Sequence, residues 1–207
     1  AERLGETHVI TCPAFPENGR SVYQGHLFVA DRLLNESGMQ DHPLTPMKDA
    51  DLRRVLAAQT SWEVTHTPMT TIRAGAAAIA AQVAALPKSM IIVDAIADSD
   101  LLEIGKAAKG SKLLTGGSGI AIGLPANFGA TPATPAWQPE GGSAAILSGS
   151  CSRATRAQVD RYTGPKREIT AAEVMDGIDA ADLAAWAVGQ AAPLIYTSAD
   201  PDVVTNA

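Results

Sequence analysis

Apolar residues form several short continuous runs along the first half of the chain. His8–Ala14 and Met90–Ala95 are rich in β-branched residues, which is typical of strands buried on both faces. Ser21–Ala30 alternates loosely between apolar and polar residues, so it predicts a strand or one arm of a hairpin. Lys112–Thr115 predicts a further strand that runs directly into a glycine-rich turn.

Segments with helical spacing lie between these runs. Asp49–Gln59 begins with acidic residues and carries apolar side chains on one face, Ile72–Leu86 is Ala-rich and ends before Pro87, and Ser99–Lys109 has Ser99 as its predicted N-cap. The order of strand, helix and strand in the middle of the chain favours parallel strands joined by a right-handed crossover.

The last third of the chain repeats this alternation. Ser143–Leu147 predicts a strand, Ala154–Tyr162 a helix and Pro193–Thr197 a second strand, while Ile169–Val174 and Ala181–Val188 are helical or mixed. Together these patterns predict an α/β fold of parallel-sheet layers with helices on both faces.

A segment without periodicity separates the two halves. Residues 126–142 are rich in proline and glycine, so they predict a linker between parts of two α/β domains. We therefore expect a first domain over residues 1–125 and a second over residues 143–207.

Composition and charge exclude several classes of protein. The net charge of −6 and the lack of basic clusters argue against nucleic-acid binding. Apolar runs fall short of the roughly 20 residues of a membrane span. The two cysteines lie far apart, and none of the four histidines has metal-ligand spacing, so we expect no disulfide, no metal site and a cytoplasmic location.

The segment Ser148–Ser152, SGSCS, follows a predicted strand and precedes a predicted helix. Backbone N–H groups and hydroxyls at a helix N-terminus suit a phosphate group, and Gly149 permits close approach of the backbone. This pattern predicts a phosphate contact by Gly149, Ser150 and Ser152. The alternative is that the serines only cap the helix.

The segment Thr115–Gly123, TGGSGIAIG, also follows a strand. Gly117, Gly119 and Gly123 resemble a dinucleotide-binding fingerprint, which would make the protein an NAD(P)-dependent oxidoreductase. The acidic residue that such a site requires is not found on a following strand, because Glu140 lies in the linker. A tight turn with close helix packing is the alternative.

Two polar clusters near the N-terminus are candidates for substrate binding. Asn18 and Arg20 lie in a turn after a strand, where an arginine is suited to bidentate binding of a carboxylate. His42 and Thr45 lie on a loop stiffened by two prolines. Solvated turns without a ligand are the alternative for both.

Three segments in this order carry a resemblance to a known family. They are CPAFPENGRSVYQGHLFVADRLLNESGMQDHPLTPM from Cys12, TGGSGIAIGLP from Thr115 and LSGSCSRATRAQV from Leu147. Together they resemble the four-carbon acid sugar kinases, and the NGR and HPLTPM patterns resemble the 3-oxo-tetronate kinase branch most. The resemblance covers essentially the whole chain.

The resemblance implies a fold, an activity and cofactors. Residues 1–125 would be the later part of an acid-sugar-binding domain, and residues 143–207 the beginning of a nucleotide-binding domain. ATP with Mg²⁺ would phosphorylate a four-carbon sugar acid of the 3-oxo-tetronate, threonate or erythronate type. Ser152 and Ser150 match a nucleotide-contacting loop, and Gly116, Gly117 and Gly119 match a loop near the cleft.

The chain also departs from the family pattern. It lacks the Asp-Asp-Phe-Thr-Gly-Ala motif and the glycine-rich Gly-Gly-Glu/Asp-Thr loop, so we expect a fragment of a longer kinase whose catalytic base lies outside this chain. Arg20, Asn18 and His42 are predicted to bind the sugar acid. An incomplete sheet would expose edges and favour self-association into a homo-oligomer. The alternatives to a kinase fragment are an NAD(P)-binding oxidoreductase and a non-catalytic remnant that binds a ligand.

Overall fold

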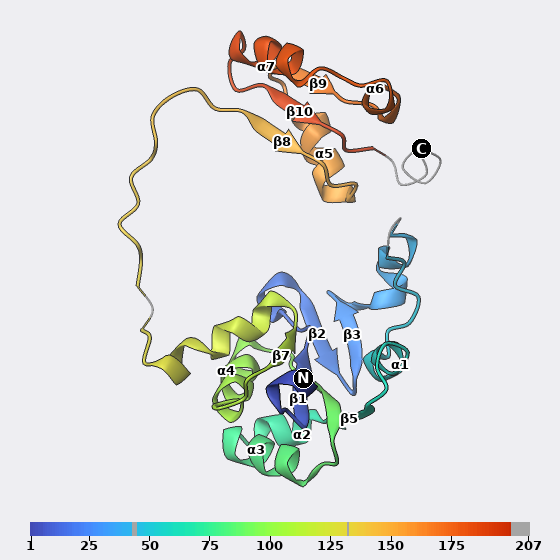
Figure 1. Ribbon diagram of the computed structural model, residues 1–207, viewed down its shortest axis with the longest axis vertical. Helices are drawn as coiled ribbons and strands as arrows, with labels where there is room; N and C mark the ends of the chain where they lie inside the picture. The colour runs from blue at the N-terminus through green and yellow to red at the C-terminus, as the bar shows by residue number, and fades with distance from the viewer. Residues whose placement is uncertain (43–44, 132, 200–207) are drawn as a thin grey trace. The chain divides into compact units, whose positions relative to one another are not determined.

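The chain forms two α/β units, each with a parallel sheet flanked by helices (Figure 1). The computed structural model describes residues 1–42, 45–131 and 133–199. The first unit is Ala1–Thr134 and the second unit is Pro135–Ala207. This arrangement confirms the predicted fold class.

The first unit is built on a four-stranded sheet in which every pair of neighbours is parallel. Its strands, in order across the sheet, are β5 (Glu63–Thr67), β6 (Ser89–Val93), β1 (His8–Cys12) and β7 (Leu114–Gly116). The register places His8 beside Ser89 and Ile10 beside Leu114. The predicted β-α-β unit is therefore present, but β1 lies between its two strands.

Three helices cover one face of this sheet. They are α2 (Met69–Arg73), α3 (Ala76–Ala85) and α4 (Asp98–Ala107). The crossovers from β5 to β6 and from β6 to β7 run in the same direction across the sheet, so right-handed connections place their helices on the same face. Ile72, Ile79, Leu101 and Ile104 bury their side chains there.

Two details of these helices differ from the sequence predictions. The single helix predicted over Ile72–Leu86 is divided into α2 and α3, because Gly75 has a φ of 92° that a continuous helix does not allow. The N-cap of α4 is Ala97 rather than Ser99. The carboxylate of Asp100 accepts hydrogen bonds from the N–H groups of Ile96 and Ala97, and it thereby caps this helix.

A small antiparallel sheet follows β1. The single strand or hairpin arm predicted over Ser21–Ala30 is a complete hairpin, whose turn has positive φ at Gln24 and Gly25. Its strands are β2 (Arg20–Tyr23) and β3 (His26–Val29), joined by β4 (Arg32–Leu33). Helix α1 (Leu52–Ala57) follows, with the side chain of Asp51 as its N-cap.

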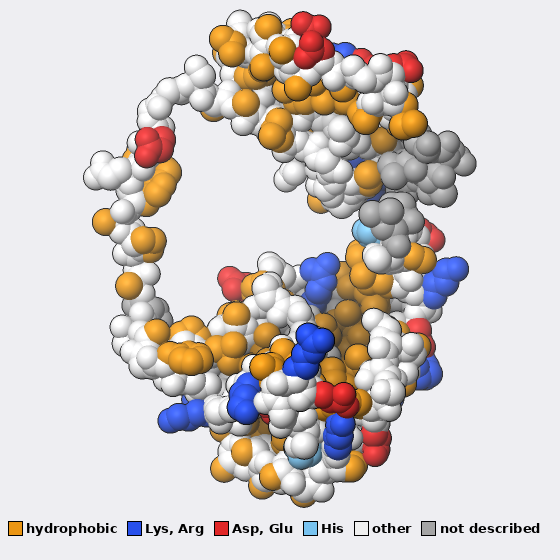
Figure 2. Space-filling view, in the orientation of Figure 1, with side chains coloured by type: hydrophobic (Ala, Val, Ile, Leu, Met, Phe, Trp, Pro, Cys, Tyr) orange, Lys and Arg blue, Asp and Glu red, His pale blue; other side chains and the backbone are white. Residues whose placement is uncertain are grey.

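Short 3-10 helices complete the first unit. They are η1 (Glu2–Leu4), η2 (Pro16–Asn18), η3 (Leu34–Glu36), η4 (Met39–Asp41), η5 (Ser118–Gly123) and η6 (Pro125–Phe128). The described residues from 129 to 145 are exposed, and hydrophobic side chains lie open along this segment (Figure 2). Trp137 leaves 76% of its surface exposed.

The second unit contains a three-stranded parallel sheet. Its strands, in order across the sheet, are β8 (Ile146–Ser148), β10 (Leu194–Tyr196) and β9 (Lys166–Glu168). Its helices are α5 (Arg153–Arg161), α6 (Ala171–Met175) and α7 (Ala180–Val188). The two crossovers run in opposite directions, so α5 covers one face and α6 and α7 cover the other (Figure 1).

Candidate functional site

The carboxyl edge of the first sheet is organised around the buried carboxylate of Asp94, directly after β6. Its two oxygens accept hydrogen bonds from the N–H groups of Gln24 and Gly25 at 3.0 Å, from the N–H of Met69 at 2.9 Å and from Nε2 of His66 at 2.8 Å. One carboxylate thus joins the β2–β3 hairpin, the start of α2 and the end of β5 to the same point of the sheet.

Asp94 remains ionised in this position. Burial alone would raise the pKa of its carboxyl, but the hydrogen bond from His66 and those from the hairpin N–H groups outweigh burial and lower the pKa. Because four donors occupy this carboxylate, its chemistry is structural rather than that of a base awaiting a substrate proton.

The turn with Asn18 and Arg20 lies at the same edge, after β1. The N–H of Glu17 approaches the carboxylate of Asp98 at 3.4 Å, which brings the turn next to the loop that follows β6. Both Asn18 and Arg20 are exposed, and Arg20 makes two backbone hydrogen bonds with Phe15. Their side chains are therefore accessible to a ligand.

The glycines of the TGGSG turn pack against the neighbouring loop. A Cβ on Gly119 would lie 2.3 Å from the carbonyl oxygen of Ala14, and one on Gly117 would lie 3.1 Å from that of Pro13. Gly123 approaches Leu101 and Gly105 of α4 as closely. Close backbone packing therefore requires these glycines, and the turn leads into the 3-10 helix η5 rather than the α-helix of a dinucleotide-binding fingerprint.

The structure thus brings four predicted residues to one edge of the first sheet: Asn18, Arg20, Gly117 and Gly119. Phe15 connects them, because it bonds to Arg20 and packs beside Gly119. His42 lies further along the chain, where its Nδ1 accepts a hydrogen bond from the N–H of Thr45. Pro43 and Leu44 of the same predicted loop lie outside the described residues.

A network of charges that the sequence analysis missed fixes the segment before α1. Asp51 is buried and accepts hydrogen bonds from Arg53 at 2.9 Å and from Arg54 at 3.0 Å, and Arg54 also binds Asp49. The hydrogen bonds from the Arg53 side chain lower the pKa of Asp51 to about 2. The signal was present in the two acidic residues that precede two basic residues over 49–54, which predicted only a helix start.

The sequence analysis also missed a cavity of about 510 Å³ in the first unit. It lies between α2 and the first turns of α4, and its polar lining includes Arg73, Ser99 and Glu103. Cys12, by contrast, is buried in the sheet, and burial raises the pKa of its thiol to about 12, so it is not a nucleophile.

In the second unit, the SGSCS segment forms the turn between β8 and α5. Ser152 is the N-cap of α5: its Oγ accepts a hydrogen bond from the N–H of Thr155 at 3.2 Å and donates to the Thr155 hydroxyl at 3.0 Å. The Oγ of Ser150 accepts a bond from the N–H of Ser152 at 3.2 Å. The helix cap that the sequence offered as the alternative is therefore present. The Ser152 hydroxyl makes two hydrogen bonds in this turn, whereas the Ser150 hydroxyl accepts one.

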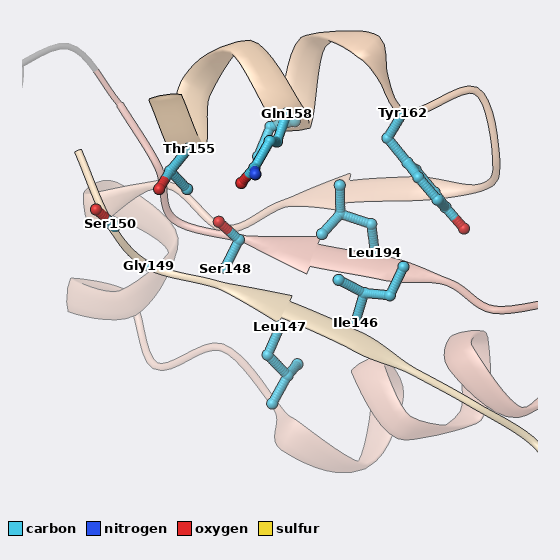
Figure 3. Close-up of a pocket in the computed structure, with 10 residues that line it drawn as sticks. Ile146, Leu147, Ser148, Gly149, Ser150, Thr155, Gln158, Tyr162 and Leu194 are labelled. Carbon is cyan, nitrogen blue, oxygen red and sulfur yellow. The ribbon is translucent and has the colours of Figure 1, made fainter. Parts of the chain in front are cut away.

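A cavity of about 470 Å³ opens beside this turn (Figure 3). Ser148, Gly149 and Ser150 form its polar end, together with Thr155. The rest of the lining is formed by Ile146, Leu147 and Leu194 from the sheet, by Gln158 and Val159 from α5, and by Tyr162 directly after α5. The cavity therefore combines hydroxyls and a helix N-terminus at one end with an apolar surface at the other.

The residues that follow β10 contact the polar end of this cavity. The hydroxyls of Ser148 and Ser198 lie 2.8 Å apart, and Thr197 lies close to Gly149. Carboxyl ends of adjacent parallel strands are a common place for ligands in α/β sheets. Of the three residues predicted to contact a phosphate, Gly149 and Ser150 line the cavity, whereas Ser152 is the N-cap of α5 and is not among the lining residues.

In residues 1–42, 45–131 and 133–199, no three or more His, Cys, Asp or Glu side chains gather as metal ligands would. Among the helices of the same ranges, none has the length and apolar character that would let it span a membrane.

Comparison with known proteins identifies the family. Residues 1–124 match the family model described as a sugar-binding N-terminal domain. The chain therefore belongs to this sugar-binding family, and its resemblance to 3-oxo-tetronate kinase-like proteins is confirmed.

Two curated relatives and one solved structure define the neighbourhood more closely. Proteins named 3-oxo-tetronate kinase from Burkholderia multivorans and Cupriavidus necator are 46% and 44% identical over 98% and 97% of this chain, which covers 51% and 50% of their own lengths. A Salmonella typhimurium structure described as a putative tRNA synthase is 34% identical, with a TM-score of 0.73 over 99% of this chain and 52% of that one. The chain thus spans about half the length of these relatives.

Proposed function

We propose that the protein takes part in the ATP-dependent phosphorylation of a four-carbon sugar acid of the 3-oxo-tetronate, threonate or erythronate type. The observation that carries this proposal is the match of nearly the whole chain to relatives named 3-oxo-tetronate kinase, at 44% and 46% identity. The sugar-binding family of residues 1–124 supports the same substrate class.

The two units supply different parts of this reaction. The first unit is proposed to hold the sugar acid at the carboxyl edge of its sheet, where Asn18 and Arg20 are accessible and Arg20 is suited to a carboxylate. His42 is proposed to contribute to the same substrate. The second unit is proposed to hold the nucleotide at the Gly149–Ser152 turn.

The cavity of the second unit fits part of a nucleotide. Hydroxyls of Ser148, Ser150 and Thr155 and the N-terminus of α5 are suited to phosphate oxygens, while Ile146, Leu194 and Tyr162 provide apolar surface for a base (Figure 3). When bound, ATP supplies the phosphoryl group and Mg²⁺ neutralises its charge. The described residues bring together no carboxylate set for Mg²⁺, so we propose that phosphate oxygens and water hold most of it.

Phosphoryl transfer depends mainly on positioning and on electrostatic stabilisation. In this proposal Arg20 orients the acid, while Ser150 and the first N–H groups of α5 orient the phosphates. The base that accepts the hydroxyl proton is proposed to belong to the Asp-Asp-Phe-Thr-Gly-Ala motif of the family, which this chain does not contain. Gly117 and Gly119 are proposed to shape the acid site through their packing.

Calorimetry of the 207-residue chain with threonate, erythronate and ATP tests this proposal. We expect binding of at least one of the acids, and weaker binding of ATP. A coupled assay for ADP, with each acid, measures whether the chain alone transfers phosphate. Absence of binding for both acids and for ATP would contradict the proposal, whereas NAD(P)H binding would favour the oxidoreductase alternative.

Ser150→Ala and Ser152→Ala separate phosphate binding from helix capping. Loss of a phosphate hydrogen bond at Ser150 should weaken ATP binding by about 1–3 kcal/mol with little change in acid binding. Ser152→Ala removes the cap as well, so the free energy of unfolding of the second unit should fall with it.

We also propose where the protein is located and how it assembles. We propose a cytoplasmic protein that self-associates through exposed edges such as β8. The description of the Salmonella protein as a putative tRNA synthase does not lead us to propose RNA binding, because the net charge of this chain is −6.

A further inference from the structure

The cavity of the second unit extends along one side of α5. Its volume of about 470 Å³ lies within the range of roughly 300–1,000 Å³ that is common for small-molecule sites. Thr155, Gln158 and Tyr162 line it in turn, and residues spaced three or four apart lie on the same side of a helix. At about 1.5 Å per residue, Gln158 lies roughly 4.5 Å along the helix axis from Thr155, which belongs to the polar end. Gln158 is therefore placed between the polar end of the cavity and its apolar end (Figure 3).

The side-chain amide of Gln158 differs from the other polar groups of the lining. Each of the four hydroxyls of the lining makes a hydrogen bond within the second unit; they belong to Ser148, Ser150, Thr155 and Tyr162. The Gln158 amide makes none in the part of the chain that the structure describes, and this residue is exposed. Figure 3 shows the amide directed from α5 toward the sheet. Its donor and its acceptor are therefore both available to a ligand in the cavity.

The part of the cavity around Gln158 is apolar and uncharged. Val159 and Leu194 leave 6% and 3% of their surfaces exposed, and Ile146 leaves 39%. None of the Asp, Glu, Lys and Arg residues that the structure describes belongs to the lining. A nucleobase has apolar faces and carries its hydrogen-bonding atoms at its edge, so it suits one free amide among apolar side chains.

The polar end of the cavity determines which part of a nucleotide meets Gln158. With phosphates at Ser150 and the N-terminus of α5, as proposed above, the ribose and the base extend along α5 toward Tyr162. The base, rather than the phosphates, then lies beside the Gln158 amide.

A glutamine amide distinguishes adenine from guanine at the edge that carries N7. Its Nε2 donates to N7 of adenine while its Oε1 accepts from the N6 amino group, so adenine satisfies both groups of the amide. Guanine carries the acceptor O6 at the position of that amino group. The Oε1 atom would then face another acceptor, and one of the two hydrogen bonds is lost.

We propose that Gln158 binds N6 and N7 of adenine and makes the cavity of the second unit selective for adenine over guanine nucleotides. The inference rests on the proposed function. It adds a residue that selects the base to the phosphate contacts proposed for the Gly149–Ser152 turn.

Titration calorimetry of the 207-residue chain with ATP and with GTP tests this assignment, with Gln190→Ala as the matched control. Gln190 is also an exposed glutamine of the second unit, and it does not line the cavity. We expect the unmodified chain to bind ATP at least about tenfold more tightly than GTP, and Gln158→Ala to lose this preference through weaker binding of ATP. Gln190→Ala should leave both affinities unchanged.

An analogue of ATP with a C–H group in place of N7, 7-deaza-ATP, tests the contact itself. The unmodified chain should bind this analogue about fivefold more weakly than ATP, because Nε2 loses its acceptor. Gln158→Ala should bind the two nucleotides equally, which a change in folding alone would not produce. The midpoint of urea unfolding should be the same for Gln158→Ala and the unmodified chain, because the Gln158 side chain is exposed.

The outcomes separate this inference from the proposed function. Equal affinities of the unmodified chain for ATP and GTP, or an affinity for ATP that survives Gln158→Ala, would overturn the inference and leave the kinase proposal standing. If the unmodified chain binds neither nucleotide, both the inference and the proposed nucleotide site of the second unit are contradicted.

Discussion

The two units of the chain share a parallel α/β arrangement but differ greatly in what they bury. In the first unit the central strands and three helices enclose a continuous apolar core that includes Ile91, Val93 and Leu101. In the described part of the second unit, Val159 and Leu194 are the apolar side chains assigned to a buried core. Leu147 and Met175 leave 77% and 84% of their surfaces exposed.

The units also differ in how their polar groups are used. The first unit buries Asp51, Asp94 and Asp100, and each of these carboxylates holds a loop or helix start in place. The second unit relies on side chains at the surface, such as Ser152 and Thr170, which cap α5 and α6. We infer that the first unit carries most of the stability, whereas the second unit presents accessible surface at low stability.

Tryptophans provide separate reporters for the two units. Trp62 lies in the first unit and Trp186 in α7 of the second. Replacing Trp137 and Trp186 by Phe leaves Trp62 as the fluorescent probe of the first unit, and replacing Trp137 and Trp62 leaves Trp186 as the probe of the second unit. Urea unfolding of each variant therefore follows one unit.

The largest effect is expected for Asp94→Ala. Four buried or half-buried donors lose their acceptor, which should reduce the free energy of unfolding of the first unit by about 3–5 kcal/mol. Urea unfolding followed by Trp62 measures this loss. Asp98→Ala, at the first residue of α4, is the control and should change the value by less than about 0.5 kcal/mol. Equal effects of the two substitutions would contradict the structural role of Asp94.

The same chemical change in both units should give very different results. Leu101→Ala creates a cavity in the core of the first unit and should cost about 3 kcal/mol, while Leu147→Ala removes exposed surface from β8 and should cost less than about 0.5 kcal/mol. Each is measured with the probe of its own unit. A comparable loss at Leu147 would mean that its side chain is buried in solution. That result would contradict the difference in apolar burial between the two units.

Acid should weaken the first unit through Asp51. Its folded-state pKa of about 2 lies below the ordinary aspartate pKa of 3.8, so its stabilisation is fully present above pH 3.8 and is lost as the pH falls toward 2. With allowance for the exposed arginine partners, the contribution near neutral pH is about 1–2 kcal/mol. Asp51→Asn keeps a side chain that can cap α1 but removes its charge. The free energy of unfolding of this variant should therefore be lower than that of the unmodified chain above pH 4, and the difference should shrink as the pH falls from 4 to 2. A deficit that is independent of pH would show that the charge of Asp51 is not what stabilises this segment.

The smallest effect is expected at the N-cap of α5. Ser152→Ala should lower the free energy of unfolding of the second unit by about 1 kcal/mol, as Trp186 fluorescence reports, and leave the Trp62 transition unchanged. Ser152→Asp, which retains a capping oxygen, is the matched control and should restore most of this loss. If Ser152→Ala shifts the Trp62 transition as well, the two units do not unfold independently.

Where one pattern dominated, the sequence predicted the elements well. β1, β6, α4 and α5 have strong apolar runs or amphipathic spacing, and all four are present close to the predicted bounds. β5 was missed because four of the five residues of Glu63–Thr67 are polar and Val64 is the one apolar residue, so this edge strand has neither an apolar run nor alternation. β9 was missed because its three residues, Lys166–Glu168, are all charged.

The candidate sites divide in the same way. The strand-to-helix position of Ser150 and Ser152 follows from local sequence, so the turn and its cavity could be anticipated. Gly119 packs against Ala14, and Arg73 and Ser99 line the same cavity, because crossovers bring distant segments together. The periodicity of a single segment does not predict such contacts, because the order of the strands in the sheet determines them.

Chemical-shift mapping of the 207-residue chain with threonate and, separately, with ATP tests the division of function between the units most directly. We expect threonate to shift the amide signals of the first unit around Asn18, Arg20 and Gly117, and ATP to shift those of the second unit around Ser148–Ser152. Threonate-induced shifts confined to the second unit, or ATP-induced shifts confined to the first, would contradict it.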